Sequence, residues 1–307
     1  MKRFAYLHSF DFVSIGFLSI LTAVELIYFP ILDRALPFII GNIAICTAVI
    51  LCARYTATTE RPNYYIRLFR DLYLFPSVLF IYTQASSISH PIHGHDFDAT
   101  LIMLDRMIFG TDPTHWIYRF AHPIFTEILQ LAYSSYYFFY FALFYELYQR
   151  SDKREYQYGM MIVAYAFYLS YVGYLLVPAI GPRFTLHNFI TTDAELPGLF
   201  LTEYLRAIIN SGGGIPAGAL DPTMYVNRDT FPSGHTEATL AAMYLAFALN
   251  TRIRWFLLVI GTLLIISTVY LRYHYVVDVI AGVIFFLFAV WSGKKIDRWW
   301  NNGIKNV

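Results

Sequence analysis

Two short segments of this chain combine the residue types that phosphoester chemistry requires. They are Phe231–Thr236 (FPSGHT) and Arg272–Asp278 (RYHYVVD), about forty residues apart. Each places a histidine at the start of a long apolar run, where a titratable ring is otherwise out of place. The pair predicts proton transfer and nucleophilic chemistry at a membrane surface.

The first segment has the composition of an anion-binding helix start. Pro232 suits the first turn of a helix, because its missing N–H would be unpaired there. The exposed N–H groups of that turn attract anions, Ser233 adds a hydroxyl donor, and Gly234 lets the backbone approach a ligand. His235 would then stand beside a bound phosphate and donate a proton to a leaving alcohol. The alternative is a serine-capped transmembrane helix with an interfacial histidine.

The second segment pairs a histidine with a carboxylate. His274 and Asp278 are four residues apart, so on a helix they share a face. A carboxylate bonded to one ring nitrogen fixes the tautomer and leaves the other nitrogen free as a nucleophile. A purely structural His–Asp clamp is the alternative. Arg183 and Arg272, both expected on the same side of the membrane, would hold the phosphate through their planar forks.

The composition is that of a membrane protein. The chain is 57% hydrophobic and only 14% charged, whereas a soluble domain has about a quarter charged residues. Its net charge of +1 and the lack of a basic tract give no indication of nucleic acid binding. We therefore expect an all-α integral membrane protein.

Eight apolar segments come close to the length of a membrane helix. They lie at about 11–31, 36–54, 68–88, 124–148, 157–178, 233–250, 255–272 and 275–293. With both termini inside, 15 of the 22 lysines and arginines fall on the inner side. This topology puts both histidines, and the long connections 89–123 and 179–232, on the outer face. We expect a bacterial inner membrane rather than a Golgi membrane.

The two histidine motifs together resemble the type 2 phosphatidic acid phosphatase superfamily. Ser-Gly-His-Thr and His-Tyr-x-x-Asp are most similar to the branch of inositol phosphorylceramide and sphingomyelin synthases. The segment Leu104–Gly110, with Pro113 and Trp116, is similar to a stretch of the phosphorylceramide synthases. The resemblance spans about residues 100–290. It implies a six-helix core, to which two N-terminal transmembrane helices are added.

The resemblance also implies roles for the site residues. His274 would form a phosphohistidine, Asp278 would orient it, and His235 would be the acid for the leaving group. The phosphate contacts would come from the four residues Ser233, Gly234, Arg183 and Arg272. Two positions depart from the phosphatase pattern, since Leu176 replaces its lysine and Thr268 its arginine. The lost charge favours a phosphodiester headgroup over a doubly charged phosphomonoester.

These observations predict three parts and one activity. Residues 1–60 would form the N-terminal transmembrane helices, 61–293 the membrane-embedded catalytic domain, and 294–307 a cytoplasmic tail. We expect transfer of a phospho-headgroup from a phospholipid to a lipid alcohol, without cofactor or metal. The alternatives are a lipid phosphatase that uses water as acceptor on a phospholipid or polyprenyl phosphate, and a non-enzymatic lipid transporter.

Three weaker signals remain open. The histidines of His90–His95 suggest a metal site by composition, but their spacing fits no standard zinc pattern, so an interfacial loop is expected. Glu237 lies inside an apolar helix, where a carboxylate is costly. The segment Ser211–Gly218 is rich in glycine and is expected to be a gate for substrate or a passive linker.

Overall fold

The structure, a computed structural model, describes the backbone of residues 4–305 and the side chains of residues 4–303. Within this range the regular structure is entirely helical, with no strand. Four of these helices, α1, α2, α9 and α15, are long and apolar enough to cross a membrane. The predicted fold class, an all-α membrane protein, is confirmed.

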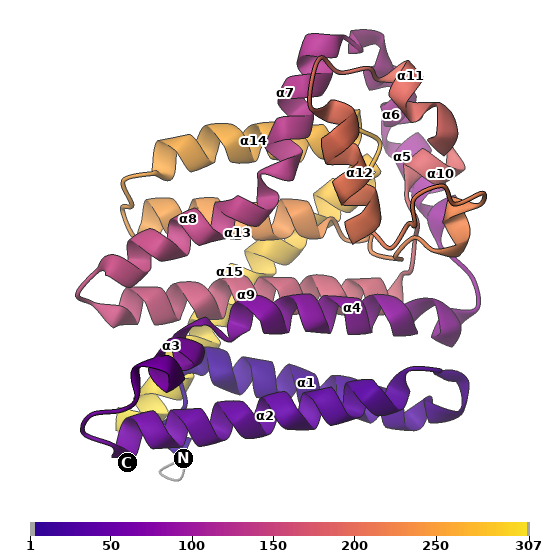
Figure 1. Cartoon of the computed structure of the whole chain (residues 1–307). Coiled ribbons are helices and arrows are strands. Elements are labelled where there is room, and N and C mark those ends of the chain that lie inside the picture. The colour runs from indigo at the N-terminus through magenta and orange to yellow at the C-terminus, as the bar shows by residue number, and fades with distance from the viewer. Residues whose placement is uncertain (1–3, 306–307) are drawn as a thin grey trace.

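Fifteen α-helices and several short 3-10 turns make up the described chain (Figure 1). The helices are α1 (Ser9–Ile27), α2 (Ala35–Thr58), α3 (Tyr64–Leu72), α4 (Leu74–His93), α5 (Asp98–Phe109), α6 (Pro113–Ile117), α7 (Pro123–Ser134), α8 (Tyr136–Gln149), α9 (Lys153–Leu176), α10 (Pro182–Thr185), α11 (Thr192–Glu195), α12 (Thr202–Gly212), α13 (Gly234–Ala248), α14 (Arg254–Tyr270) and α15 (Val276–Lys305).

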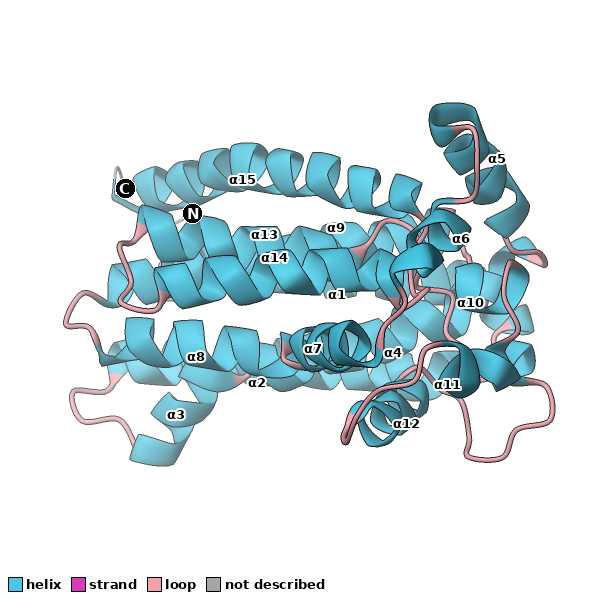
Figure 2. Ribbon diagram, turned by 90° about the horizontal axis from the view of Figure 1, so that it is seen from above, coloured by secondary structure: helices cyan, strands magenta, loops and turns pink. Residues whose placement is uncertain are grey.

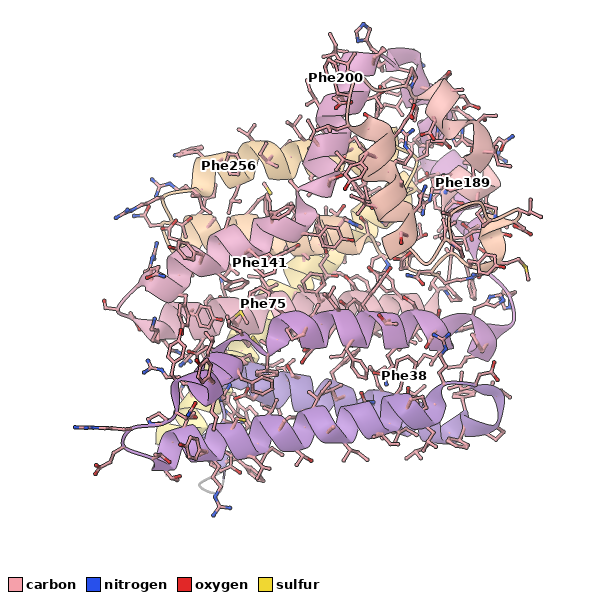
Figure 3. All side chains as sticks on the ribbon, in the orientation of Figure 1. Phe38, Phe75, Phe141, Phe189, Phe200 and Phe256 are labelled. Atoms are coloured by element: carbon pink, nitrogen blue, oxygen red, sulfur yellow. The ribbon has the colours of Figure 1, made fainter. Side chains whose placement is uncertain are left out.

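Helix α9 is the centre of a helical bundle. It packs against α1, α4, α8, α13 and α15, and it is buried over most of its length. Helices on the outside of the bundle present apolar side chains instead. Phe141 on α8 and Phe256 on α14 are both more than half exposed, as expected for a surface that faces lipid (Figure 3).

The short helices gather at one end of the bundle. Helices α5, α6, α10 and α11 lie at the end opposite the two chain termini (Figure 1). They belong to the two long connections that the sequence predicts on one side of the membrane. The histidine segments enter the bundle at this same end.

The expected span 124–148 is not one helix. The structure breaks it at Ser135 into α7 and α8, and α7 is seen end-on in Figure 2 while α8 lies along the bundle. Consecutive serines, Ser134 and Ser135, explain the break, because the Ser135 hydroxyl donates to the carbonyl of Ala132 (2.6 Å) and serine pairs are common sites of helix kinks. Helix α7 packs against α12 across the end of the bundle.

Two other boundaries differ from expectation. The third expected span begins at Leu74, because Arg67, Arg70 and Asp71 belong to the separate helix α3. At the C-terminus, α15 continues to Lys305 through the segment predicted as a tail.

Candidate active site

Helix α13 begins at the FPSGHT motif, but Pro232 lies before the N-cap and not in the first turn as expected. Ser233 is the N-cap, and its hydroxyl oxygen accepts from the N–H of Thr236 (3.2 Å). The N–H of Ser233 donates to the carbonyl of Asp278 (3.0 Å), which ties α13 to α15. At Gly234 a Cβ would lie 2.1 Å from the hydroxyl of Tyr174, so any larger residue would have to displace that side chain. Ser233 and Gly234 are buried by these contacts and are not among the residues that line the cavity described below.

His274 lies in the turn between α14 and α15. Its Nδ1 is 2.9 Å from the carbonyl oxygen of Thr230 and 3.5 Å from Oδ2 of Asp278. A carbonyl can only accept, so this geometry assigns the proton to Nδ1 and the lone pair to Nε2. The carboxylate of Asp278 also accepts from the N–H of Tyr275 (2.8 Å) and so caps α15. Orientation of His274 is therefore shared between Thr230 and Asp278.

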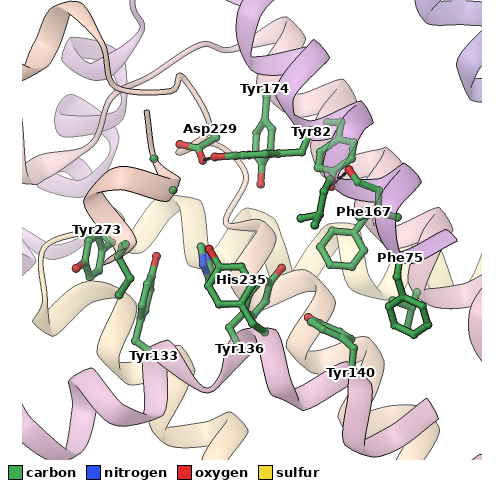
Figure 4. Close-up of a pocket in the computed structure, with 18 of the residues that line it drawn as sticks. Phe75, Tyr82, Tyr133, Tyr136, Tyr140, Phe167, Tyr174, Asp229, His235 and Tyr273 are labelled. Atoms are coloured by element: carbon green, nitrogen blue, oxygen red, sulfur yellow. Dashed lines mark hydrogen bonds between the residues drawn. The ribbon is translucent and has the colours of Figure 1, made fainter. Parts of the chain in front are cut away.

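The two histidines face each other. Nε2 of His274 is 3.5 Å from Nδ1 of His235, and their ring centroids are 5.6 Å apart. The ring of Tyr133 stacks on that of His235, with centroids 4.6 Å apart. The ring of Tyr136 also packs against His235, tilted, with centroids 4.4 Å apart (Figure 4). Burial lowers the pKa of His274 to about 4, so its ring is neutral at neutral pH.

The two predicted arginines have different environments. Arg183 on α10 lines the same cavity as the histidines, donates to Oδ1 of Asn210 (2.7 Å) and lies over the ring of Tyr273 (4.8 Å). Arg272 points away from that cavity. Its guanidinium donates to Glu195 on α11 (2.5 Å) and lies over the ring of Tyr118 (5.0 Å). The structure thus brings Arg183 to the histidine pair and leaves Arg272 in an ion pair outside it.

A cavity of about 460 Å³ runs from the histidine pair into the bundle. Its upper part is lined by His235, His274, Arg183 and Asp229, and its lower part by side chains of α4, α8 and α9 as far as Met160. Most of the lining is aromatic or aliphatic (Figure 4). On α9 the lining runs from Met160 to Tyr174, a rise of about 21 Å. The rings of Phe75 and Phe141 stack between α4 and α8, with centroids 5.0 Å apart (Figure 3).

Three carboxylates near the site were missed by the sequence analysis. Asp229 lines the cavity, and the hydroxyl of Tyr82 donates to it. Asp98 accepts from the N–H groups of Ile180 (3.0 Å) and Gly181 (2.8 Å). Its other partner is the hydroxyl of Tyr275 (2.8 Å).

Asp105 accepts from the two N–H groups at the start of α15, those of Val276 (3.0 Å) and Val277 (2.8 Å). Asp229 lies only four residues before Ser233, so its closeness to the predicted site could have been expected from the sequence. Asp98 acts on backbone far away in the sequence, so no local pattern marks it. Asp105 lies in the segment Leu104–Gly110, whose resemblance was noted above without a role for the carboxylate.

The weaker signals are placed as follows. Helix α4 continues to His93, so only the end of the histidine segment, from Gly94, lies in the loop that was expected. Nε2 of His93 is 2.8 Å from the carbonyl of Leu175, and among the described residues no group of three His, Cys, Asp or Glu is placed to hold a metal ion. Glu237 is buried and accepts from Ser170, away from the cavity lining. Gly212 and Gly213 line the cavity.

Comparison with known proteins identifies the family of this chain. A PA-phosphatase related-family protein of Dictyostelium discoideum is 27% identical over 192 residues, which cover 57% of this chain and 33% of that relative. The chain thus spans about a third of the relative's length. No solved structure matches. A family model described as the PAP2 superfamily matches residues 99–292, more than half of the chain and both histidine segments, and the chain therefore belongs to the PAP2 superfamily.

Proposed function

We propose that this protein transfers a phospho-headgroup from a phospholipid to a lipid alcohol through a phosphohistidine on His274. The observation that carries the proposal is the position of the histidine pair, 3.5 Å apart at the head of a largely apolar cavity that also contains Arg183. Such an arrangement would suit a nucleophile, a proton donor and a cation that act on one phosphate, beside a space suited to lipid chains.

In the first step, Nε2 of His274 attacks phosphorus, and the bond from phosphorus to the diacylglycerol oxygen breaks. The carbonyl of Thr230 and the carboxylate of Asp278 face the Nδ1 proton and stabilise the ring as it becomes positive. Arg183 binds the non-bridging oxygens. His235, protonated beside the phosphate, gives its proton to the departing oxygen.

In the second step, the hydroxyl oxygen of the acceptor attacks the same phosphorus. The bond between phosphorus and Nε2 of His274 breaks, and His235 takes the hydroxyl proton. Atoms and protons are balanced over the two steps, and His235 returns to its protonated form. The headgroup stays bonded to phosphorus throughout.

Two features support a lipid acceptor and a phosphodiester donor. The cavity below the histidines is lined mainly by Phe, Tyr and aliphatic side chains, which suits a lipid better than water. Arg183 is the one arginine among the described residues that line it, because Arg272 is paired with Glu195. One arginine balances the single charge of a phosphodiester better than the two charges of a phosphomonoester. We place this site on the outer face of a bacterial inner membrane.

The test is an assay of the purified protein in lipid vesicles. Headgroup-labelled phosphatidylinositol, phosphatidylglycerol and phosphatidic acid are incubated with and without ceramide or diacylglycerol, and the products are separated. We expect a new lipid carrying the labelled headgroup. Release of free phosphate or free phospho-headgroup alone would instead identify a hydrolase.

Variants test the role of each histidine. His274→Ala is expected to abolish turnover and to remove an acid-labile, base-stable labelled adduct from the protein. His235→Ala is expected to slow both steps by about 10²–10⁴-fold, the usual contribution of a general acid and base. His95→Ala, an exposed histidine outside the cavity, is the matched control. Full activity of His274→Ala would contradict the mechanism.

A further inference from the structure

Asp229 is a carboxylate in the cavity to which the steps above give no task. It lies in the segment that leads into FPSGHT, between Arg228 and Thr230, and its side chain is partly accessible from the cavity. The hydroxyl of Tyr82 on α4 donates to Oδ2 of Asp229. The amide of Asn227 in turn donates to that hydroxyl oxygen (2.8 Å), so the carboxylate is held in place.

The groups around Asp229 make its position unusual for a phosphate site. Arg183 and His274 line the same part of the cavity, and the rings of Tyr133 and Tyr174 form the adjacent walls (Figure 4). A carboxylate in this position repels the phosphate that Arg183 attracts. A buried carboxylate is also costly unless hydrogen bonds satisfy it. Among the described residues, Tyr82 is the one side chain that donates to Asp229, and it binds Oδ2, so no side chain donates to Oδ1.

A ligand resolves this conflict if it brings a hydrogen-bond donor next to its phosphate. The headgroup of a phospholipid meets this requirement, because it remains attached to phosphorus in both proposed steps. The lipid chains do not, because the lower cavity is apolar. An inositol, glycerol or ethanolamine headgroup carries O–H or N–H donors, whereas a methyl or choline headgroup carries none.

We propose that Asp229 binds O–H or N–H donors of the phospholipid headgroup and so selects phosphodiester donors that carry them. The inference rests on the proposed function, which it extends to the class of substrate. Tyr82 fixes one carboxylate oxygen, and the other accepts from the headgroup. A hydrogen bond to a charged group of this kind corresponds to a preference of roughly ten- to a hundredfold in kcat/KM.

The experiment compares pairs of lipids that have the same acyl chains. Phosphatidylglycerol and phosphatidylmethanol have the same charge, but only the first has headgroup hydroxyls. Phosphatidylethanolamine and phosphatidylcholine form a second pair, with and without N–H donors. We expect the wild-type protein to prefer the first member of each pair by about ten- to a hundredfold. Asp229→Ala should bring both ratios close to one, and Asp229→Asn should reduce them less.

The matched control is Asp96→Asn. Asp96 is a carboxylate of the other long connection, paired with Arg228 and not among the cavity-lining residues. Its variant should keep the wild-type ratios. Ratios close to one in the wild-type protein would overturn the inference. So would an equal loss on all four lipids in Asp229→Ala, which would assign Asp229 to the reaction or to the fold.

A binding measurement separates this inference from the proposed function. In the His274→Ala background, the dissociation constants of the same four lipids report headgroup selection without turnover. We expect the same preference there, and its loss in the double variant His274→Ala/Asp229→Ala. If no lipid is turned over by the wild-type protein but the dissociation constants still depend on Asp229, the proposed function fails and the headgroup site stands.

Discussion

The backbones of Arg183 and Arg272 are hydrogen-bonded to each other, but their side chains bind different partners. The N–H of Arg183 donates to the carbonyl of Arg272 (3.1 Å), so their backbones are joined. Their guanidinium groups diverge, with Arg183 in the cavity and Arg272 bonded to Glu195. Arg272 also has a φ of 66°, a left-handed conformation that is rare for a residue with a side chain. The ion pair with Glu195 therefore holds the backbone that leads directly to His274.

This ion pair predicts a pH-dependent stability. Hydrogen bonds from Thr191 and from Arg272 lower the pKa of Glu195. Its carboxylate thus stabilises the folded protein above the unfolded-state pKa, and that contribution is lost as the pH falls through the lower folded-state pKa. Glu195→Gln should destabilise the protein by about 1 kcal/mol at neutral pH, because the buried guanidinium loses a partly exposed partner.

The measurement is the midpoint of thermal unfolding in detergent, at neutral pH and at roughly pH 3. The difference between wild type and Glu195→Gln should shrink at the lower pH, as the Glu195 carboxylate takes up a proton. Glu203→Gln, an exposed carboxylate on α12, is the control and should show no difference at either pH. A difference that persists in acid would contradict the role of the ion pair.

Residues within a motif were predictable, and residues that act through space were not. Ser233 as helix cap and the pairing of His235 with His274 follow from local pattern and shared topology. The role of Thr230 does not, because a backbone carbonyl leaves no trace in the residue type. The environment of Arg272 also escaped prediction, since its partner Glu195 is 77 positions away.

At the scale of elements, the break between α7 and α8 shapes the site. Helix α8 follows the bundle and lines the lower cavity, whereas α7 turns across the end of the bundle and packs against α12. Tyr133 and Tyr136, which contact His235, lie on either side of the break. Hydrophobicity predicted a single span here, because apolar residues continue through Ser134 and Ser135. It carries no information on a change of helix direction.

A contact between helix α5 and the start of α15 leads to a second prediction at this scale. Asp105 accepts from the N–H groups of Val276 and Val277, which begin α15 two residues after His274. Asp105→Ala leaves both groups without this acceptor and removes a negative charge from a helix N-terminus. The expected destabilisation is about 1–2 kcal/mol. Because the turn that carries His274 loses its support, kcat should fall about tenfold or more while KM changes little.

Thermal unfolding and steady-state kinetics on a turned-over lipid measure the two effects. Asp105→Asn keeps one acceptor and should recover part of kcat, which a merely bulky replacement would not. Asp112→Ala, which removes a partly buried carboxylate paired with the exposed Arg106 on the same connection, is the control. Lower stability with an unchanged kcat would show that Asp105 supports the fold and does not position His274.

At the scale of the whole molecule, the N-terminal helices are joined to the rest of the bundle by buried polar contacts. Arg70 of α3 donates to Asp11 of α1 with both terminal nitrogens, one of them at 2.9 Å, and both side chains are buried. The hydroxyl of Tyr73 donates to the same carboxylate (2.7 Å). Residues 1–60 were predicted as a separate part, but these contacts make α1 a support for the start of α4.

The ion pair of Asp11 and Arg70 is expected to affect the stability of the protein without affecting its catalytic rate. Asp11→Ala leaves Arg70 as a buried, unpaired charge and should destabilise the protein by about 3–5 kcal/mol. The double variant Asp11→Leu/Arg70→Met replaces both charges with apolar groups and should recover most of that loss, because the cost of desolvation disappears. At a temperature where each variant is folded, kcat should stay within about twofold of wild type, since effects of distant sites are usually independent. Thermal unfolding and lipid turnover in the same detergent test this.

If the double variant is as unstable as Asp11→Ala, the ion pair itself holds α1 in place. If kcat falls in parallel with stability, the N-terminal helices belong to the catalytic unit and the division at residue 60 is wrong.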